Sequence, residues 1–83
     1  MKVQVRYFAS LREALGPMES VDAPVGSSVG SLRQLLISRS GAHAEALAPG
    51  KLVRAALNQS LCDESAELEE GAEVAFFPPV TGG

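Results

Sequence analysis

The sequence predicts a single α+β domain in which one main helix packs across one face of a mixed sheet of four to five strands. Two alternating segments near the N-terminus precede one amphipathic helix, and alternating segments return in the second half of the chain. The length of 83 residues leaves room for one domain only. We therefore expect two layers, with the apolar side of the helix on the sheet.

Residues 3–8 have the period-two pattern of a strand with one face on a core. Val3, Val5 and Tyr7 fall on the core face, and Phe8 falls on the opposite face. An exposed Phe is informative in a chain with few large aromatic residues, so Phe8 is a candidate surface residue.

A short helix and an edge strand are expected next. Ser10 and Glu13 have the spacing of a capping box, and Gly16 supplies the end of the helix. Residues 18–23 alternate weakly and have a proline on each side, which favours a strand at the edge of the sheet.

The main helix is predicted to open at Ser27 and Ser28 and to end at Gly41. Its apolar positions repeat at helical spacing, and its polar positions are expected to face largely away from the core. The apolar set is Val29, Leu32, Leu35 and Leu36, and the polar set is Arg33, Gln34 and Arg39.

The second half of the chain predicts a loop at 42–50 and a strand at 52–58. The Asn58-Gln59 pair turns the chain into a short strand at 60–62, and residues 73–77 form the last strand. The first and last strands, both rich in Val and aromatic residues, are expected to be central neighbours.

Composition excludes several classes of function. A net charge of −3 and a pI near 5.0 argue against nucleic-acid binding, and no apolar run is long enough to span a membrane. Cys62 is the single cysteine, which leaves no disulfide and no multi-cysteine metal site and fits a reducing, cytoplasmic location. His43 is expected to be a surface residue in a polar loop. No metal site is predicted.

Two sets of charges leave alternatives open. The acidic residues between 63 and 73 form either a solvated loop or a surface that steers a basic partner. Arg6 and Arg12 either flank a docking surface or only keep the protein soluble.

The chain ends in FFPPVTGG at 76–83. Pro78 and Pro79 must end the sheet, so we expect a domain at 1–79 and a flexible tail at 80–83 that reaches roughly 13–14 Å. The terminal glycines are either frayed or are needed to thread a partner's channel and present the α-carboxylate. A carboxylate requires activation, and the chain has no phosphate-binding loop for ATP, so a partner enzyme must activate it.

Three segments carry a resemblance to a known family. FFPPVTGG, KLVRAALNQSL at 51–61 and GAEVAFFPP at 71–79 resemble the small subunit of molybdopterin synthase (MoaD). This sulfur-carrier family has a ubiquitin-like β-grasp fold, and the similarity covers essentially the whole chain.

The resemblance implies a pathway in which the chain binds no cofactor itself. An E1-like adenylyltransferase uses ATP to adenylate Gly83, and a sulfurtransferase converts the adenylate to a thiocarboxylate. The large subunit of molybdopterin synthase then receives the tail, with Gly82 allowing it to thread and Val80 and Thr81 lining the channel. There sulfur passes to cyclic pyranopterin monophosphate, and the large subunit supplies the catalytic side chains. The family implies a heterotetramer of two small and two large subunits.

The resemblance also gives a role to apolar side chains outside the core. Phe8 and Phe77 are expected to face away from the main helix on neighbouring strands, and Leu61 lies just after the predicted turn. Together with Pro78 and Pro79 they predict a partner-binding patch at the base of the tail.

Three other functions remain open from the sequence. Two glycines at the C-terminus also suit a sulfur carrier for thiamine synthesis or transfer-RNA thiolation, and a ubiquitin-like protein modifier. The last alternative is an interaction module whose C-terminal tail has no chemical role.

Overall fold

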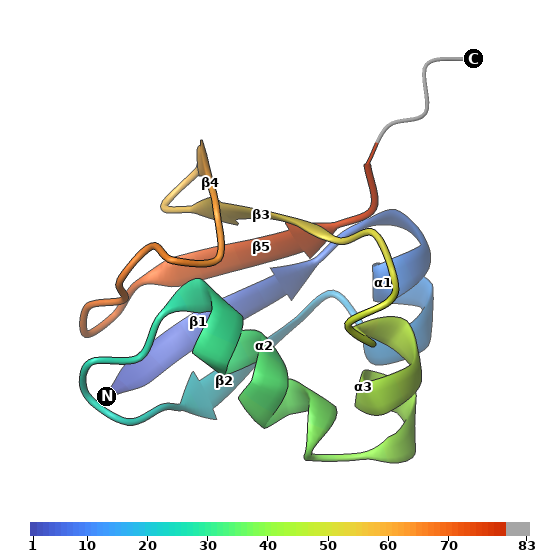
Figure 1. Ribbon diagram of the computed structural model, residues 1–83, viewed down its shortest axis with the longest axis horizontal. Helices are drawn as coiled ribbons and strands as arrows, with labels where there is room; N and C mark the ends of the chain where they lie inside the picture. The colour runs from blue at the N-terminus through green and yellow to red at the C-terminus, as the bar shows by residue number, and fades with distance from the viewer. Residues whose placement is uncertain (80–83) are drawn as a thin grey trace.

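The computed structural model describes residues 1–79, which form a five-stranded sheet and three helices (Figure 1). The strands are β1 (Lys2–Tyr7), β2 (Met18–Asp22), β3 (Arg54–Leu57), β4 (Ser60–Cys62) and β5 (Glu73–Phe77). The helices are α1 (Ala9–Leu15), α2 (Val29–Ile37) and α3 (Gly41–Ala46). Residues 80–83, on which the predicted flexible tail falls, lie outside the described residues.

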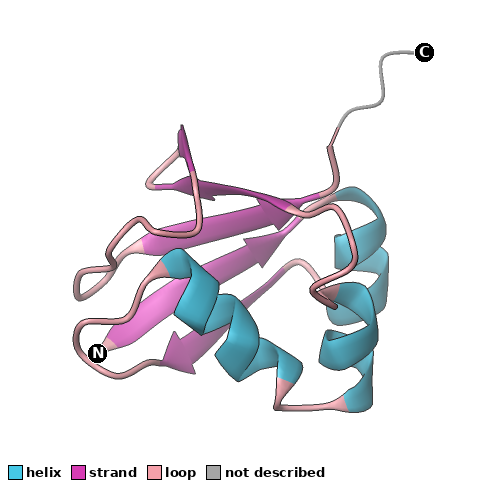
Figure 2. Cartoon of the chain, viewed as in Figure 1, coloured by secondary structure: helices cyan, strands magenta, loops and turns pink. Residues whose placement is uncertain are grey.

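The sheet is mixed, as predicted, with the strand order β2-β1-β5-β3-β4. The central strands β1 and β5 are parallel, and the other three pairs are antiparallel. β2 lies at an edge, which confirms the expectation from its flanking prolines. In Figure 2, α2 lies across the sheet, while α1 and α3 stand together at the end where β1 and β5 finish.

The hydrophobic core lies between the sheet and α2. Alternate residues of the central strands and the apolar stripe of α2 supply it, each no more than 1% exposed: Val3, Val5, Tyr7, Val29, Leu32, Leu36, Val74 and Phe76. Complete burial of a side chain of this size stabilises the fold by roughly 1.5–3 kcal/mol. The predicted core positions are confirmed, except that Leu35 is only half-buried.

The start of α2 is fixed by two serines and a glycine. Ser28 is the N-cap, and its side chain and that of Ser31 each accept the other's backbone N–H, at 3.2 and 2.8 Å. A Cβ on Gly30 would lie 3.1 Å from both Cβ and the carbonyl oxygen of Glu64. Gly30 is a poor helix former, but its lack of a Cβ lets the acidic loop around Glu64 approach α2.

The predicted start of α1 was wrong. The helix begins at Ala9 behind Phe8, which caps it without a side-chain hydrogen bond, so Ser10 forms no capping box. The chain turns sharply because Ala9 adopts a positive φ of 53°, and the backbone amide of Leu11 then donates to the Phe8 carbonyl. The expected end at Gly16 is confirmed, with φ at 89°.

The predicted loop at 42–50 was also wrong, because it contains most of α3. α2 ends at Ile37, and Gly41 is the first residue of α3 instead of a terminator. The Ser40 side chain caps the new helix by accepting the backbone N–H of His43. A helix of six residues has too few turns for a periodic signal, and its stability comes from this cap and from packing.

The hairpin between β3 and β4 is confirmed. Asn58 and Gln59 have φ values of 49° and 71°, as a two-residue hairpin turn requires, and Leu57 pairs with Ser60. The Asn58 side chain also accepts the backbone N–H of Glu73, which joins the turn to the start of β5.

Candidate functional site

The two faces of the sheet have different surroundings. The helices cover the face that carries Phe76, which is 1% exposed. The next residue, Phe77, lies on the opposite face with Ala75 and Ala56, and all three are partly exposed. We call this second face, which no helix of residues 1–79 covers, the open face.

Two aromatic residues meet at the end of the open face. The backbone N–H of Phe8 donates to the Phe76 carbonyl at 3.1 Å, so the parallel register of β1 and β5 continues and Phe8 follows alongside Phe77. Phe8 is 39% exposed. The guanidinium carbon of Arg6 lies 5.5 Å from the centre of the Phe8 ring, a cation–π contact worth about 0.5–1 kcal/mol at an exposed site.

Leu61 lies on the same face, on the edge strand β4. It pairs with Ala56, which in turn pairs with Ala75 on β5, so its side chain is on the open face and is 68% exposed. The structure thus places three predicted residues on one face: Phe8 directly after β1, Phe77 on β5 and Leu61 on β4. Their role in binding a partner stays a prediction.

The sequence reasoning missed two residues of this face. Met18 pairs with Arg6 from β2 and is 54% exposed, and Arg54 pairs with Phe77 from β3. The alternation around the buried Val21 and Ala55 would have placed both on the open face. We call Phe8, Met18, Leu61 and Phe77 the open-face patch.

The base of the tail adjoins this patch. β5 ends at Phe77, as the following prolines predicted, and Pro78 and Pro79 are both half-buried. The remaining predicted site residues, Val80, Thr81, Gly82 and Gly83, lie outside the described residues.

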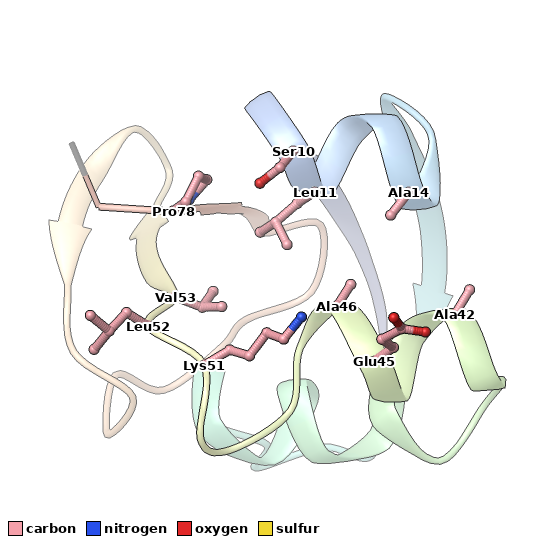
Figure 3. A pocket seen from close by; sticks show the side chains of 10 residues that line it. All are labelled: Ser10, Leu11, Ala14, Ala42, Glu45, Ala46, Lys51, Leu52, Val53 and Pro78. Carbon is pink, nitrogen blue, oxygen red and sulfur yellow. The ribbon is translucent and has the colours of Figure 1, made fainter. Parts of the chain in front are cut away.

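Pro78 also forms part of an open pocket of about 570 Å³ on the helical side (Figure 3). α1 supplies Ser10, Leu11 and Ala14, α3 supplies Ala42, Glu45 and Ala46, and residues 51–53 and Pro78 complete the wall. Most of the lining is apolar, and its ionised groups are those of Glu45 and Lys51.

Arg33 was predicted to face away from the core but is only 6% exposed. Its guanidinium donates to the carbonyl oxygens of Leu47, Ala48 and Lys51 at 2.7–3.0 Å and to a Glu64 carboxylate oxygen at 2.7 Å. These bonds satisfy the buried charge and hold the segment between α3 and β3, which forms one wall of the pocket.

His43 was predicted to be a surface residue in a loop, but it lies on α3 with a side chain 16% exposed. Its Nε2 is 2.8 Å from a Glu19 carboxylate oxygen, and its Nδ1 is 2.7 Å from the Ser40 hydroxyl. The carboxylate can only accept, so Nε2 carries a proton. The Tyr7 hydroxyl donates to the same Glu19 oxygen at 2.7 Å. The contacts tie α3 to the sheet, and none faces the pocket or the open face.

The Glu19 carboxylate has a pKa below its ordinary value. Burial raises the pKa, but the hydrogen bonds from His43 and Tyr7 and the charges of His43 and Arg39 together outweigh it. Burial, together with the hydrogen bond to Glu19 and the charge of that carboxylate, raises the pKa of Tyr7 far above that of a free phenol, against a smaller lowering by Arg39.

Cys62 is half-buried on β4 and has no features of a reactive thiol. Burial raises its pKa, and the neighbouring Asp63 raises it further against a smaller opposing effect of a backbone hydrogen bond. Within residues 1–79, no three His, Cys, Asp or Glu side chains could hold a metal ion. No helix in this part of the chain is both long and apolar enough to cross a bilayer.

A mixed five-stranded sheet with parallel central strands and a helix across one face defines the class of ubiquitin-like β-grasp proteins. The ThiS family model matches residues 5–83. The molybdopterin synthase sulfur carrier subunit of Escherichia coli is 44% identical over 81 residues, covering 98% of this chain and 99% of that protein. The chain belongs to the ThiS family and, within it, groups with the molybdopterin synthase sulfur carrier subunits.

Solved structures agree with this assignment. SAMP1 from Haloferax volcanii has a TM-score of 0.79 at 27% identity, with full coverage of both chains. A chain of the complex of subunits 1 and 2 of molybdopterin-converting factor from Helicobacter pylori has a TM-score of 0.70 at 28% identity, again with full coverage of both.

Proposed function

We propose that this protein carries sulfur for molybdopterin synthesis on its C-terminal glycine. The observation that carries the proposal is the position of the open-face patch, a group of exposed apolar side chains beside the base of a terminus ending in two glycines. Full-length similarity to carriers of this kind supports the assignment.

The chemistry takes place on the terminal carboxylate and is performed by partners. An E1-like adenylyltransferase directs the Gly83 carboxylate onto the α-phosphate of ATP, which forms the acyl-adenylate and releases pyrophosphate. A sulfurtransferase supplies sulfur at the oxidation level of sulfide, which attacks the acyl carbon, breaks its bond to the AMP phosphate oxygen, releases AMP and leaves a thiocarboxylate.

Transfer of the sulfur takes place in the large synthase subunit. The open-face patch docks on that subunit, and Val80 and Thr81 lead Gly82 and Gly83 to cyclic pyranopterin monophosphate. Glycine suits the last positions because a backbone without Cβ fits a narrow channel. The Helicobacter pylori complex is a precedent for association of two such subunits.

Deletion of Gly82 and Gly83 tests the proposal. The truncated protein should keep its fold by circular dichroism but give no molybdopterin when mixed with the activating enzyme, a sulfur source and the large subunit. Intact-mass analysis of the full chain should show one oxygen replaced by sulfur. Molybdopterin formation by the truncated protein would reject every carrier function.

Protein modification is the second candidate. The observation that favours it is the similarity to a small archaeal modifier protein, with a TM-score of 0.77 at 26% identity. A modifier would accumulate in cells as conjugates through its C-terminus, whereas a sulfur carrier would accumulate as the free thiocarboxylate. Immunoblots and intact-mass analysis of the protein from its own cells separate the two.

A further inference from the structure

The charges of this protein are unevenly distributed along β5. Six of the ten carboxylate side chains of the protein lie between residues 63 and 73, in the segment that leads into β5 and at Glu73, the first residue of that strand. Two arginines lie farther along the open face: Arg6 beside Ala75, the middle residue of β5, and Arg54 beside Phe77, its last residue. A molecule of net charge −3 thus has positive charge beside the open-face patch.

Arg54 lies directly beside the central aromatic residue of the patch. It pairs with Phe77 in the antiparallel register of β3 and β5, and its side chain is exposed. No carboxylate in residues 1–79 lies within 4.0 Å of its guanidinium. Its hydrogen-bonding groups are therefore available to another molecule.

Arg6 lies on the other side of β5, on β1, where it pairs with Ala75, two residues before Phe77 on the same face. Its Nη1 is 3.9 Å from a Glu73 oxygen, and the two side chains are 44% and 32% exposed. An ion pair this long and this exposed contributes little to stability, so Arg6 can exchange it for a better partner at small cost. Its plane already rests near the Phe8 ring, which limits the freedom that binding would remove.

We propose that the open-face patch binds a protein surface with an apolar centre and carboxylates on both sides of it, placed to meet Arg6 and Arg54. This inference rests on the proposed function, because it describes the surface of the large subunit that takes the patch. Arginine suits the role because its planar group donates two parallel hydrogen bonds to one carboxylate.

The acidic segment sets the orientation of this partner. Carboxylates that attract Arg6 and Arg54 are repelled by the segment at 63–73, so the reversed orientation is disfavoured. The favoured orientation places the partner's acidic side chains at the end of β5, next to the base of the tail.

Binding of the large subunit of the same organism's molybdopterin synthase to the full-length chain tests the inference. Arg54→Gln should weaken binding about threefold to tenfold at low salt, mainly through slower association, and high salt should remove most of the difference. Gln34→Glu is the matched control, since it also changes the net charge from −3 to −4, but on the exposed side of α2. It should bind as the wild type does.

The double variant R6Q/R54Q should weaken binding further than Arg54→Gln, and exchange of the facing carboxylates for arginine in the large subunit should restore binding to R6E/R54E. Wild-type affinity in R6Q/R54Q at low salt would overturn the inference alone, provided that Phe77→Ala still weakens binding. An equal loss in Gln34→Glu would overturn it too, because net charge would then explain the effect. Absence of binding by the wild-type chain would reject the proposed function together with this inference, as would self-association through the patch.

Discussion

Phe76 and Phe77 are consecutive residues of one strand with opposite surroundings. Phe76 is 1% exposed, lies against the helices and stacks near Tyr7 with ring centres 6.4 Å apart. Phe77 is partly exposed on the open face, between Arg54 and the end of β1.

The comparison separates residues that hold the fold from residues that are available to partners. A strand with one covered face normally alternates apolar and polar residues, and β5 departs from this rule by placing an aromatic residue on its second face. A large apolar side chain there gains less stability than one in the core. Its presence is explained if another protein covers it.

Substitution of the two phenylalanines should give the largest contrast. Phe76→Ala should lower the free energy of unfolding by about 3–5 kcal/mol, because it opens a cavity in the hydrophobic core. Phe77→Ala should lower it by about 1 kcal/mol or less. Urea denaturation measures both, and similar losses in the two variants would show that the faces are not distinct.

Arg33 and Arg54 allow the same comparison of the covered and open faces for charged side chains. Arg33→Met should cost about 3 kcal/mol of folding stability, because three carbonyl oxygens and the Glu64 carboxylate lose a buried partner. Arg54→Met on the open face should change stability by less than about 0.5 kcal/mol. Thermal and urea unfolding of the pair provide the measurement, and a stable Arg33→Met variant would contradict the structural role.

Substitutions on the open face should have the larger effect when binding, instead of stability, is measured. Phe77→Ala should weaken association with the large synthase subunit by about 2 kcal/mol or more, roughly 30-fold, as loss of a central aromatic anchor does. Leu35→Ala, at a half-buried position on α2, is the control and should bind normally once folded. Calorimetric titration of folded variants checks this. If Phe77→Ala binds with wild-type affinity, the open-face patch is not the docking surface.

The smallest of these effects should be a loss of folding stability in acid that depends on Glu19, on the covered face of the sheet. Its pKa is lower in the folded protein than the ordinary value of 4.5, so the unfolded chain binds the proton more readily. The free energy of unfolding contributed by Glu19 is therefore present above about pH 4.5 and is lost as the pH falls through the folded pKa.

Glu19→Gln should reduce this acid-induced loss of stability, as measured by urea denaturation at a series of pH values. The wild-type chain, measured at the same pH values, is the reference. An equally steep loss in Glu19→Gln would exclude this carboxylate as its source.

Much of the fold could be predicted because each strand alternates with respect to one core. The positions of Val3, Val5, Tyr7, Val74 and Phe76 followed from this period, and the turn at Asn58-Gln59 followed from residues that tolerate positive φ. The exposed side of Phe8 and Phe77 followed in the same way.

The failures share a different cause. α3 was too short for a periodic signal, and Ser10 lost its predicted cap because β1 runs directly into α1 through Phe8. Arg33 and His43 look solvent-exposed in the sequence, since their partners are not their neighbours along the chain.

The sequence by itself determined which residues of the central strands face the core and where the last strand ends, because these depend on local periodicity and on proline. Only the tertiary structure decided the burial of Arg33, the contact of His43 with Glu19 and the position of Arg54 beside Phe77. Arg33 meets partners 14 to 31 residues away, and His43 meets Glu19 at a separation of 24. Contacts at such separations arise from the packing of whole elements, which no local pattern records.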